Sequence, residues 1–293
     1  VLNTQIINKN ITISGPVTSV GFDDSGATAS NGGAVILNAS GTLSTTGIVT
    51  SGGNGTGFAG GNAGNIGLTG GTGISFAGNS LANGGTGTST GTRGTFTASG
   101  GSGAVTLGST NVSAASVVIA ATGITSSGGT VDAGAGTIQL DGNTTGAINL
   151  AGALTTTNAT AGAVDIGNAT SVQLGAVTAS SGGISVTGSG NVTSTGAMSA
   201  GSDNTLAATG ASADVSVSNT ITRSSNAVAD TTLTVRAGNN IAFNSSADVV
   251  TNGSFKQNVI LNSNPDATGA YRLGNGLTPP KKIKDAPPEY PAI

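Results

Sequence analysis

The chain has 293 residues, of which 51 are Gly, 7% are charged and 3% are aromatic, and it contains no Cys, His or Trp. A globular domain of this length would normally carry about 25% charged residues. The missing Cys excludes disulfides and thiol chemistry, and the missing His removes the usual general base. A net charge of −3 with scattered basic residues argues against a nucleic-acid partner. No run approaches the ~20 apolar residues of a membrane span, so we expect no membrane insertion.

The N-terminal part of the chain is strand-like. Residues 1–14 are unusually aliphatic for this composition, and they predict a first coil, a cap, or a strand that docks on another molecule. From Val35 onward one short phrase recurs, in which two aliphatic residues flank a third that is usually small or polar. Apolar residues two positions apart indicate a strand with one buried face. The copies lie at residues 35–37, 66–68, 105–107, 138–140, 148–150, 164–166, 172–174, 184–186, 215–217, 233–235, 241–243 and 259–261.

The spacing of these phrases predicts coils. The strongest phrases place coil starts at residues 138, 164, 184, 215, 233 and 259, with two or three phrases in one step. Three short strands per turn, joined by Gly, Asn and Ser corners, form a triangular coil whose strands pair in parallel with their copies above and below. We expect one domain over residues 1–278, about ten coils and a rod about 50 Å long. The glycine-rich sequence from Ser51 to Gly101 predicts coils that bulge outward.

The aliphatic residues of the later phrases should point inward and stack in ladders along the axis. The residues predicted to do so are Val164, Ile166, Ile184, Val186, Val215, Val217, Leu233, Val235, Val259 and Leu261.

The C-terminus has a different composition, since five of the seven prolines lie between residues 279 and 291. Proline cannot donate to a strand ladder, so the solenoid should end by about Thr278 and residues 279–293 should form an extended tail. We expect this tail to bind a neighbouring copy of the chain. The residues predicted to make that contact are Lys281, Lys282, Lys284, Tyr290 and Ile293.

Three segments, residues 33–38, 60–68 and 258–264, resemble repeats of the filamentous haemagglutinin family, which are large bacterial exoproteins of the two-partner secretion type. The resemblance covers roughly residues 30–275. It implies a right-handed parallel β-helix, export across an outer membrane, and a role in adhesion, aggregation or biofilm structure. Whether the chain is an internal rod segment or a small complete subunit stays open.

The acidic residues give little support for catalysis, which needs converging carboxylates or a Lys or Arg base in a cleft. The eleven Asp and one Glu are spread almost singly, and Asp165 should point outward because it lies between two apolar residues. Asp132 and Asp141 lie in Gly-rich turns nine residues apart. Two acids are too few for a calcium ladder. We predict no catalytic residue, no cofactor and no metal site, although a lone surface calcium stays open.

Four Thr-x-Thr pairs, at residues 86–88, 95–97, 220–222 and 232–234, suggest an ice-binding alternative. That function needs the pair at the same place on every coil, and these positions are irregular.

These features together predict an all-β, right-handed parallel β-helix with about three short strands per coil. For function they favour a secreted bacterial surface protein, either an adhesin or a matrix rod, whose partners are host or bacterial surface glycans or proteins. The main alternative is a subunit that polymerises end to end into an extracellular filament. A carbohydrate-active enzyme and an ice-binding solenoid are the less favoured alternatives.

Overall fold

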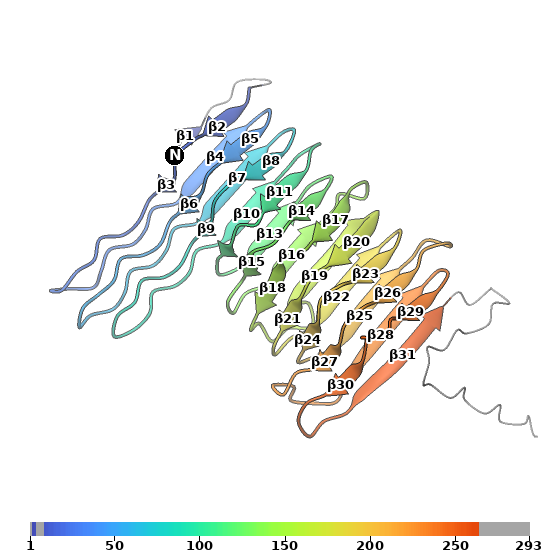
Figure 1. Ribbon diagram of the computed structural model, residues 1–293. Helices are drawn as coiled ribbons and strands as arrows, with labels where there is room; N and C mark the ends of the chain where they lie inside the picture. Colours follow the sequence, from blue (N-terminus) through green and yellow to red (C-terminus); the bar gives the residue numbers. More distant parts are fainter. Residues whose placement is uncertain (1, 4–8, 264–293) are drawn as a thin grey trace, which may run out of the picture.

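The computed structural model describes residues 2–3 and 9–263, and every regular element in that part of the chain is a β-strand (Figure 1). The strands form three parallel sheets of 11, 10 and 10 strands. Every third strand returns to the same sheet, so the chain winds as a right-handed parallel β-helix with three short strands per coil. This confirms the predicted fold class. No helix able to span a bilayer occurs among these residues.

We call the sheets A, B and C in the order in which each coil visits them. Sheet A contains β1 (Leu2–Asn3), β4 (Val35–Ala39), β7 (Ile66–Gly70), β10 (Phe96–Ser99), β13 (Val117–Ala120), β16 (Ile138–Asp141), β19 (Val164–Ala169), β22 (Ile184–Gly188), β25 (Asn204–Ala208), β28 (Thr231–Ala237) and β31 (Gln257–Ser263). Sheet B contains β2 (Ile11–Ile13), β5 (Leu43–Thr45), β8 (Ile74–Phe76), β11 (Val105–Gly108), β14 (Ile124–Ser126), β17 (Ala147–Leu150), β20 (Ser171–Leu174), β23 (Val192–Ser194), β26 (Val215–Val217) and β29 (Ile241–Phe243). Sheet C contains β3 (Val17–Thr18), β6 (Ile48–Val49), β9 (Ser80–Leu81), β12 (Val112–Ser113), β15 (Thr130–Asp132), β18 (Ala153–Thr156), β21 (Val177–Ala179), β24 (Met198–Ala200), β27 (Ile221–Arg223) and β30 (Val249–Thr251).

The interior of the rod is built from aliphatic ladders. Ile184 and Val186 of β22 are buried, and each is in register with an aliphatic residue of β19. The same alternation returns through the middle of the rod, as the spacing of the phrases predicts. Val259 and Leu261 also lie in register with Leu233 and Val235, but they are 46% and 47% exposed. They are exposed because β31 is the last described strand of its sheet.

One predicted coil start is wrong. Val215 begins β26 in sheet B, whereas the sheet A strand of that coil is β25, which begins at Asn204. Asn204 occupies an aliphatic ladder position between Ile184 and Leu233, so the aliphatic pattern misses this strand. The side chain is buried, and its Oδ1 accepts the Ile184 N–H at 3.3 Å. A hydrogen bond therefore compensates the amide for its burial.

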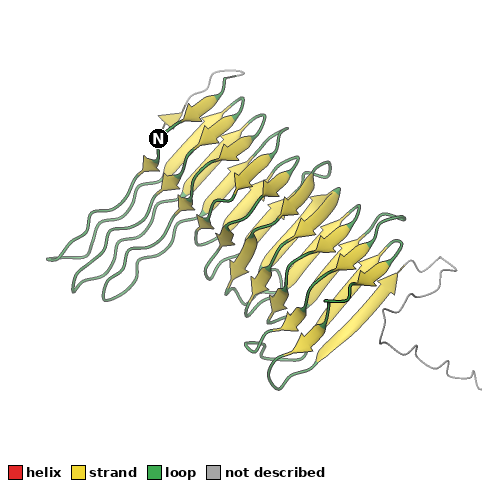
Figure 2. Cartoon of the chain, viewed as in Figure 1, coloured by secondary structure: helices red, strands yellow, loops and turns green. Residues whose placement is uncertain are grey.

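The glycine-rich part of the chain forms long corners between sheets C and A (Figure 2). These corners span residues 19–34, 50–65 and 82–95, whereas the corresponding corner of the next coil spans only residues 114–116. The outward extension therefore begins one coil earlier than the composition predicts. At the N-terminus, the described parts of residues 1–14 contribute β1 and β2 to the first coil. The predicted tail, with Lys281, Lys282, Lys284, Tyr290 and Ile293, lies outside the described residues.

Replacing Val186 with Asp should destabilise the rod by several kcal/mol, because the carboxylate would enter an aliphatic ladder without a partner. Thr187→Asp is the matched control, since Thr187 is only half-buried on the opposite face of the same strand. Urea unfolding followed by circular dichroism would measure both changes. Equal losses for the two variants would contradict the assignment of the inner face.

Candidate functional site

The three long corners stack into one lateral projection, which we call the glycine fin and define as residues 19–34, 50–65 and 82–95. Each corner contributes an arm that runs out from sheet C and returns to sheet A, and Figure 1 shows the arms side by side at the N-terminal end of the rod. The fin is the main departure from a regular coil among the described residues. It is therefore the first candidate for a functional surface.

Main-chain hydrogen bonds join each arm to the next. In the outgoing limbs, Gly52 donates to Asn83 O at 3.0 Å and Gly55 donates to Thr86 O at 2.8 Å. In the returning limbs, Gly60 donates to Ser89 O at 2.9 Å. The donors recur every third residue, which is the period of a polyproline II helix. The ladders of the solenoid thus continue into the fin without regular strands.

Further hydrogen bonds run across and between the limbs. Gly61 donates to Gly53 O within one arm at 2.9 Å, and Gly85 donates to Gly61 O of the preceding arm at 2.9 Å. Because three residues complete one turn, successive N–H groups point in three directions and reach three neighbouring limbs. The result is a cross-linked slab of main chain that stays ordered without an aliphatic core.

Glycine allows this close packing. A Cβ on Gly61 would overlap the carbonyl group of Ser30, and a Cβ on Gly85 would overlap the carbonyl group of Gly53. Since the obstacle is main chain in each case, a side chain could be accommodated only by separating the limbs. The glycine content of this region thus follows from limb-to-limb contact as well as from turns.

Asp and Asn side chains add ladders along the fin. Asp23 Oδ1 accepts the Asn54 N–H at 2.6 Å, and Asn54 Oδ1 accepts the Thr86 N–H at 2.9 Å. On the returning limb, Asn62 Oδ1 accepts the Thr92 N–H at 2.8 Å. Each of these side chains satisfies a donor in the arm above it. The Asp23 carboxylate therefore has a structural role in the fin.

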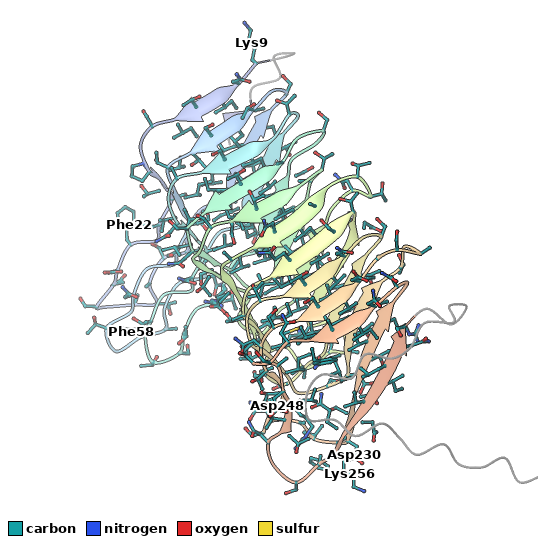
Figure 3. The ribbon with its side chains drawn as sticks, turned by 45° about the vertical axis from the view of Figure 1, so that its right-hand side comes forward. Lys9, Phe22, Phe58, Asp230, Asp248 and Lys256 are labelled. Atoms are coloured by element: carbon teal, nitrogen blue, oxygen red, sulfur yellow. The ribbon has the colours of Figure 1, made fainter. Side chains whose placement is uncertain are left out.

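The fin displays large apolar side chains. Phe22 is 84% exposed, Val20 is 52% exposed and Phe58 is 40% exposed. Figure 3 shows the Phe22 ring pointing away from the ribbon and Phe58 on the outer part of the fin. In contrast, Phe76 and Phe96 pack together inside the rod with ring centroids 5.9 Å apart. Exposed aromatic side chains on a rigid surface are typical of contact sites.

Arg93 anchors the base of the third arm. Its Nη2 donates to Asp132 Oδ2 at 2.6 Å and to Ser113 Oγ at 2.6 Å, and its Nη1 donates to the Ala114 carbonyl at 3.2 Å. The arm is thereby fastened to the short corner of the following coil, which has no arm of its own. This is the one ion pair that the described residues form.

A shallow groove on the outer face of sheet A brings two acids together. Asp141 of β16 and Asp165 of β19 line it with Gln139 and Asn168. Asp141 accepts hydrogen bonds from the Asn143 N–H at 2.7 Å and from Asn168 Nδ2 at 2.9 Å. Spacing along the chain did not predict this arrangement, because register across the sheet sets Asp165 opposite Gln139 and diagonal to Asp141. Asp165 is exposed between its two buried neighbours, as predicted.

Asp132 and Asp141, the two acids considered for calcium, lie in different sheets. Asp132 lies at the end of β15 and is bound by Arg93, whereas Asp141 lies at the end of β16 in another sheet. Over the described part of the chain, no three acids gather where they could hold a metal ion. The Thr-x-Thr pairs are also dispersed, because residues 86–88 lie in the fin, 95–97 and 232–234 at strands of sheet A, and 220–222 at a strand of sheet C.

Comparison with known proteins adds no relative, because no family model, curated protein or solved structure matches this chain. The fold is a parallel β-solenoid.

Replacing Gly61 with Ala should open the fin while leaving the solenoid folded, because the new methyl group would displace Ser30 in the neighbouring arm. Gly26→Ala is the matched control, since a Cβ there meets only Asp24 Oδ1 at 3.7 Å. Amide hydrogen exchange should rise in residues 50–65 for the first variant and stay unchanged for the second. Unchanged exchange in Gly61→Ala would show that the limbs are not in close contact.

The Arg93–Asp132 pair should stabilise the base of the fin in a pH-dependent way. Burial by itself would raise the pKa of Asp132, but hydrogen bonds from Arg93, Gly134 and Thr155 and the charge of Arg93 hold that pKa below its usual 3.8. A lowered folded-state pKa gives stabilisation that is complete well above pH 3.8 and is lost as the pH falls through the folded value. Solvent screens this half-exposed pair, so we expect at most about 1 kcal/mol.

Arg93→Met tests this by removing the cation. The carboxyl pKa of Asp132, followed by NMR, should rise in this variant, and the loss in unfolding free energy should be visible at pH 7 and shrink near pH 3. Arg236→Met, in the exposed outer row of β28, is the control. An Asp132 pKa that does not move would contradict the role assigned to Arg93.

Proposed function

We propose that this chain forms a rod of a secreted or surface-bound bacterial protein, with a structural and adhesive role. The observation that carries the proposal is the fin, which holds Phe22 and Phe58 on a hydrogen-bonded platform beside a regular solenoid. A platform that is already ordered loses little conformational entropy when a partner binds. The partners would be glycans or proteins of host or bacterial surfaces.

The arrangement of the acidic residues supports a non-catalytic role. The Asp141–Asp165 groove is shallow, and Asp141 is already engaged by Asn143 and Asn168. General acid–base chemistry needs a proton donor and acceptor aimed at one reacting bond. The groove lining contains no Lys or Arg to act as a base. An adhesive surface requires none of these features.

Composition and repeat texture support the proposed location. The chain has no Cys, which suits a protein exported unfolded through an oxidising compartment. Its phrases resemble filamentous haemagglutinin repeats, and a β-solenoid is the architecture that this resemblance implies. Export, surface display and a role in adhesion or biofilm structure follow as parts of the same proposal.

Adhesion can be measured with beads that carry the purified chain, applied to bacterial cells, to host cells and to uncoated surfaces. Replacing Phe22 and Phe58 together with Ser should reduce cell binding at least several-fold, because the exposed rings supply the contact area of the fin. Val228→Ser is the control, since Val228 is 86% exposed and lies near the other end of the rod. Circular dichroism should be the same for all variants.

A second variant tests the fin as a whole. Each arm is replaced by the short corner of residues 114–116, which keeps the strands and their register. Beads that carry this variant should lose cell binding while the rod keeps its unfolding transition. If the shortened rod binds cells as well as the native chain does, the proposed adhesive role of the fin is wrong.

A further inference from the structure

The exposed large apolar side chains of the described residues are concentrated at the two ends of the rod. Phe58 lies in the second arm of the fin, one coil in from the N-terminal end. At the N-terminal end the exposed residues are Val20, Phe22 and Ile36, and at the C-terminal end they are Val228, Phe255, Val259, Ile260 and Leu261. A solenoid end also presents unpaired main-chain groups, which makes it a template for further strands.

The two ends match in sequence, ladder by ladder. Following the register through sheet B connects Ile241 with Ile11. The same procedure connects Val249 with Val17 in sheet C. In sheet A it connects Val259 with Val35. Each of these three inward ladders thus begins and ends on an aliphatic residue.

We propose that the rod joins end to end with further copies of itself, so that β29, β30 and β31 of one copy pair with β2, β3 and β4 of the next. This inference rests on the proposed structural role of the chain. The partner that it names is a second copy of the same chain. The contact is head to tail and stacks the rods along one axis, so it cannot close into a ring. It therefore produces a filament.

The order in which each coil visits the three sheets decides which strands meet at the joint. The last described strands are β29 in sheet B, β30 in sheet C and β31 in sheet A. Stacking β2 on β29 and β3 on β30 places β31 at the level of β1 of the next copy, beside β4. In the single chain β1 pairs with β4 through only Leu2 and Asn3, whereas β31 has seven residues for the five of β4. The longer strand of the incoming copy takes the place of the shorter one.

A side-chain ladder also continues across the joint. Asn191 Oδ1 accepts the Asp214 N–H at 2.9 Å, and Asp214 Oδ1 accepts the Asn240 N–H at 2.9 Å. Asn240 is the next member, and the register places Asn10 of the following copy directly above it. Asn10 Oδ1 in turn accepts the Thr42 N–H at 2.9 Å. An asparagine therefore lies on each side of the joint. Its side-chain oxygen can accept the main-chain N–H of the next coil and so continue the ladder.

The outer faces of the ends are compatible as well. In the joint, Ile260 stacks on Ile36, and these two side chains are 51% and 39% exposed in the single chain. The contact covers both of them and extends the apolar area to the outer face of sheet A. Arg223 of β27, one coil before the end, donates to the Asn252 carbonyl, and its Cζ lies 5.8 Å from the centre of the Phe255 ring. These contacts hold the corner between β30 and β31 against the preceding coil.

Cysteine cross-linking tests the register, since the native chain has no Cys. Thr12 and Ala242 are exposed on β2 and β29, and the joint places them on neighbouring strands, about 4.8 Å apart and within the Cα range of a disulfide. In one chain they are separated by roughly 40 Å of stacked coils, so they cannot bond to each other. Oxidation of Thr12→Cys/Ala242→Cys should give a ladder of multimers that reductant removes.

Thr12→Cys/Thr125→Cys is the matched control, because Thr125 has the same outward orientation in the middle of sheet B. It should give no multimer longer than a dimer. Equal ladders from the two double variants would overturn the proposed joint, and so would monomers alone from Thr12→Cys/Ala242→Cys at high concentration.

Leu261→Lys tests the apolar ladder of the same joint. Sedimentation velocity should shift from concentration-dependent polymers to monomers, while Val228→Lys, in a corner outside the three strand edges, should still polymerise. If the native chain is monomeric and Leu261→Lys only lowers its unfolding midpoint, Leu261 packs within its own chain and the proposal is wrong. The cross-linking and sedimentation experiments leave the fin unchanged. A failed adhesion test would therefore contradict the adhesive role of the fin and not the proposed joint.

Discussion

Main-chain hydrogen bonding between successive coils is the interaction on which the rest of this structure depends. Each strand is only two to seven residues long and gains its partners from the coils above and below it. No coil satisfies its own N–H and C=O groups, so stability comes from stacking and grows with the number of coils. The aliphatic ladders fill an interior that is one side chain thick. This explains how a chain with few aromatic and charged residues forms an extended fold.

The glycine fin shows how far this interaction extends without a hydrophobic core. Its limbs lie outside the rod, where main-chain hydrogen bonds and Asp or Asn side chains replace burial. Such an arrangement requires limbs in close contact, and that is why residues such as Gly61 and Gly85 cannot carry a side chain without separating the limbs. Arg93 closes the fin where the next coil has only a short corner. The rod thus carries a rigid side surface at one end.

Function on such a scaffold depends on surfaces. The groove with Asp141 and Asp165 is open and its hydrogen bonds are local, whereas the fin and the two ends present apolar side chains on ordered main chain. We propose different roles for these surfaces. The fin is suited to contact with other molecules, and the ends carry the same ladders and are suited to contact between copies. A filament that presents one fin per subunit would combine adhesion with length.

Much of this architecture could be predicted from the sequence, because a period of two in phrases such as 184–186 reports burial directly, and the return of the phrases reports coils. The fold class, the inward ladders and the outward Asp165 followed from that pattern. The coil that begins at Asn204 did not, because its ladder position is held by an amide whose hydrogen-bond partner lies in another coil. Composition indicated a bulge, but only the tertiary structure decided that the glycine limbs pair with one another. It also decided that Asp132 pairs with Arg93 and that Asp141 and Asp165 line the same groove. Each of these contacts depends on the register between coils, and register is set by stacking, which the order of residues along one coil does not contain.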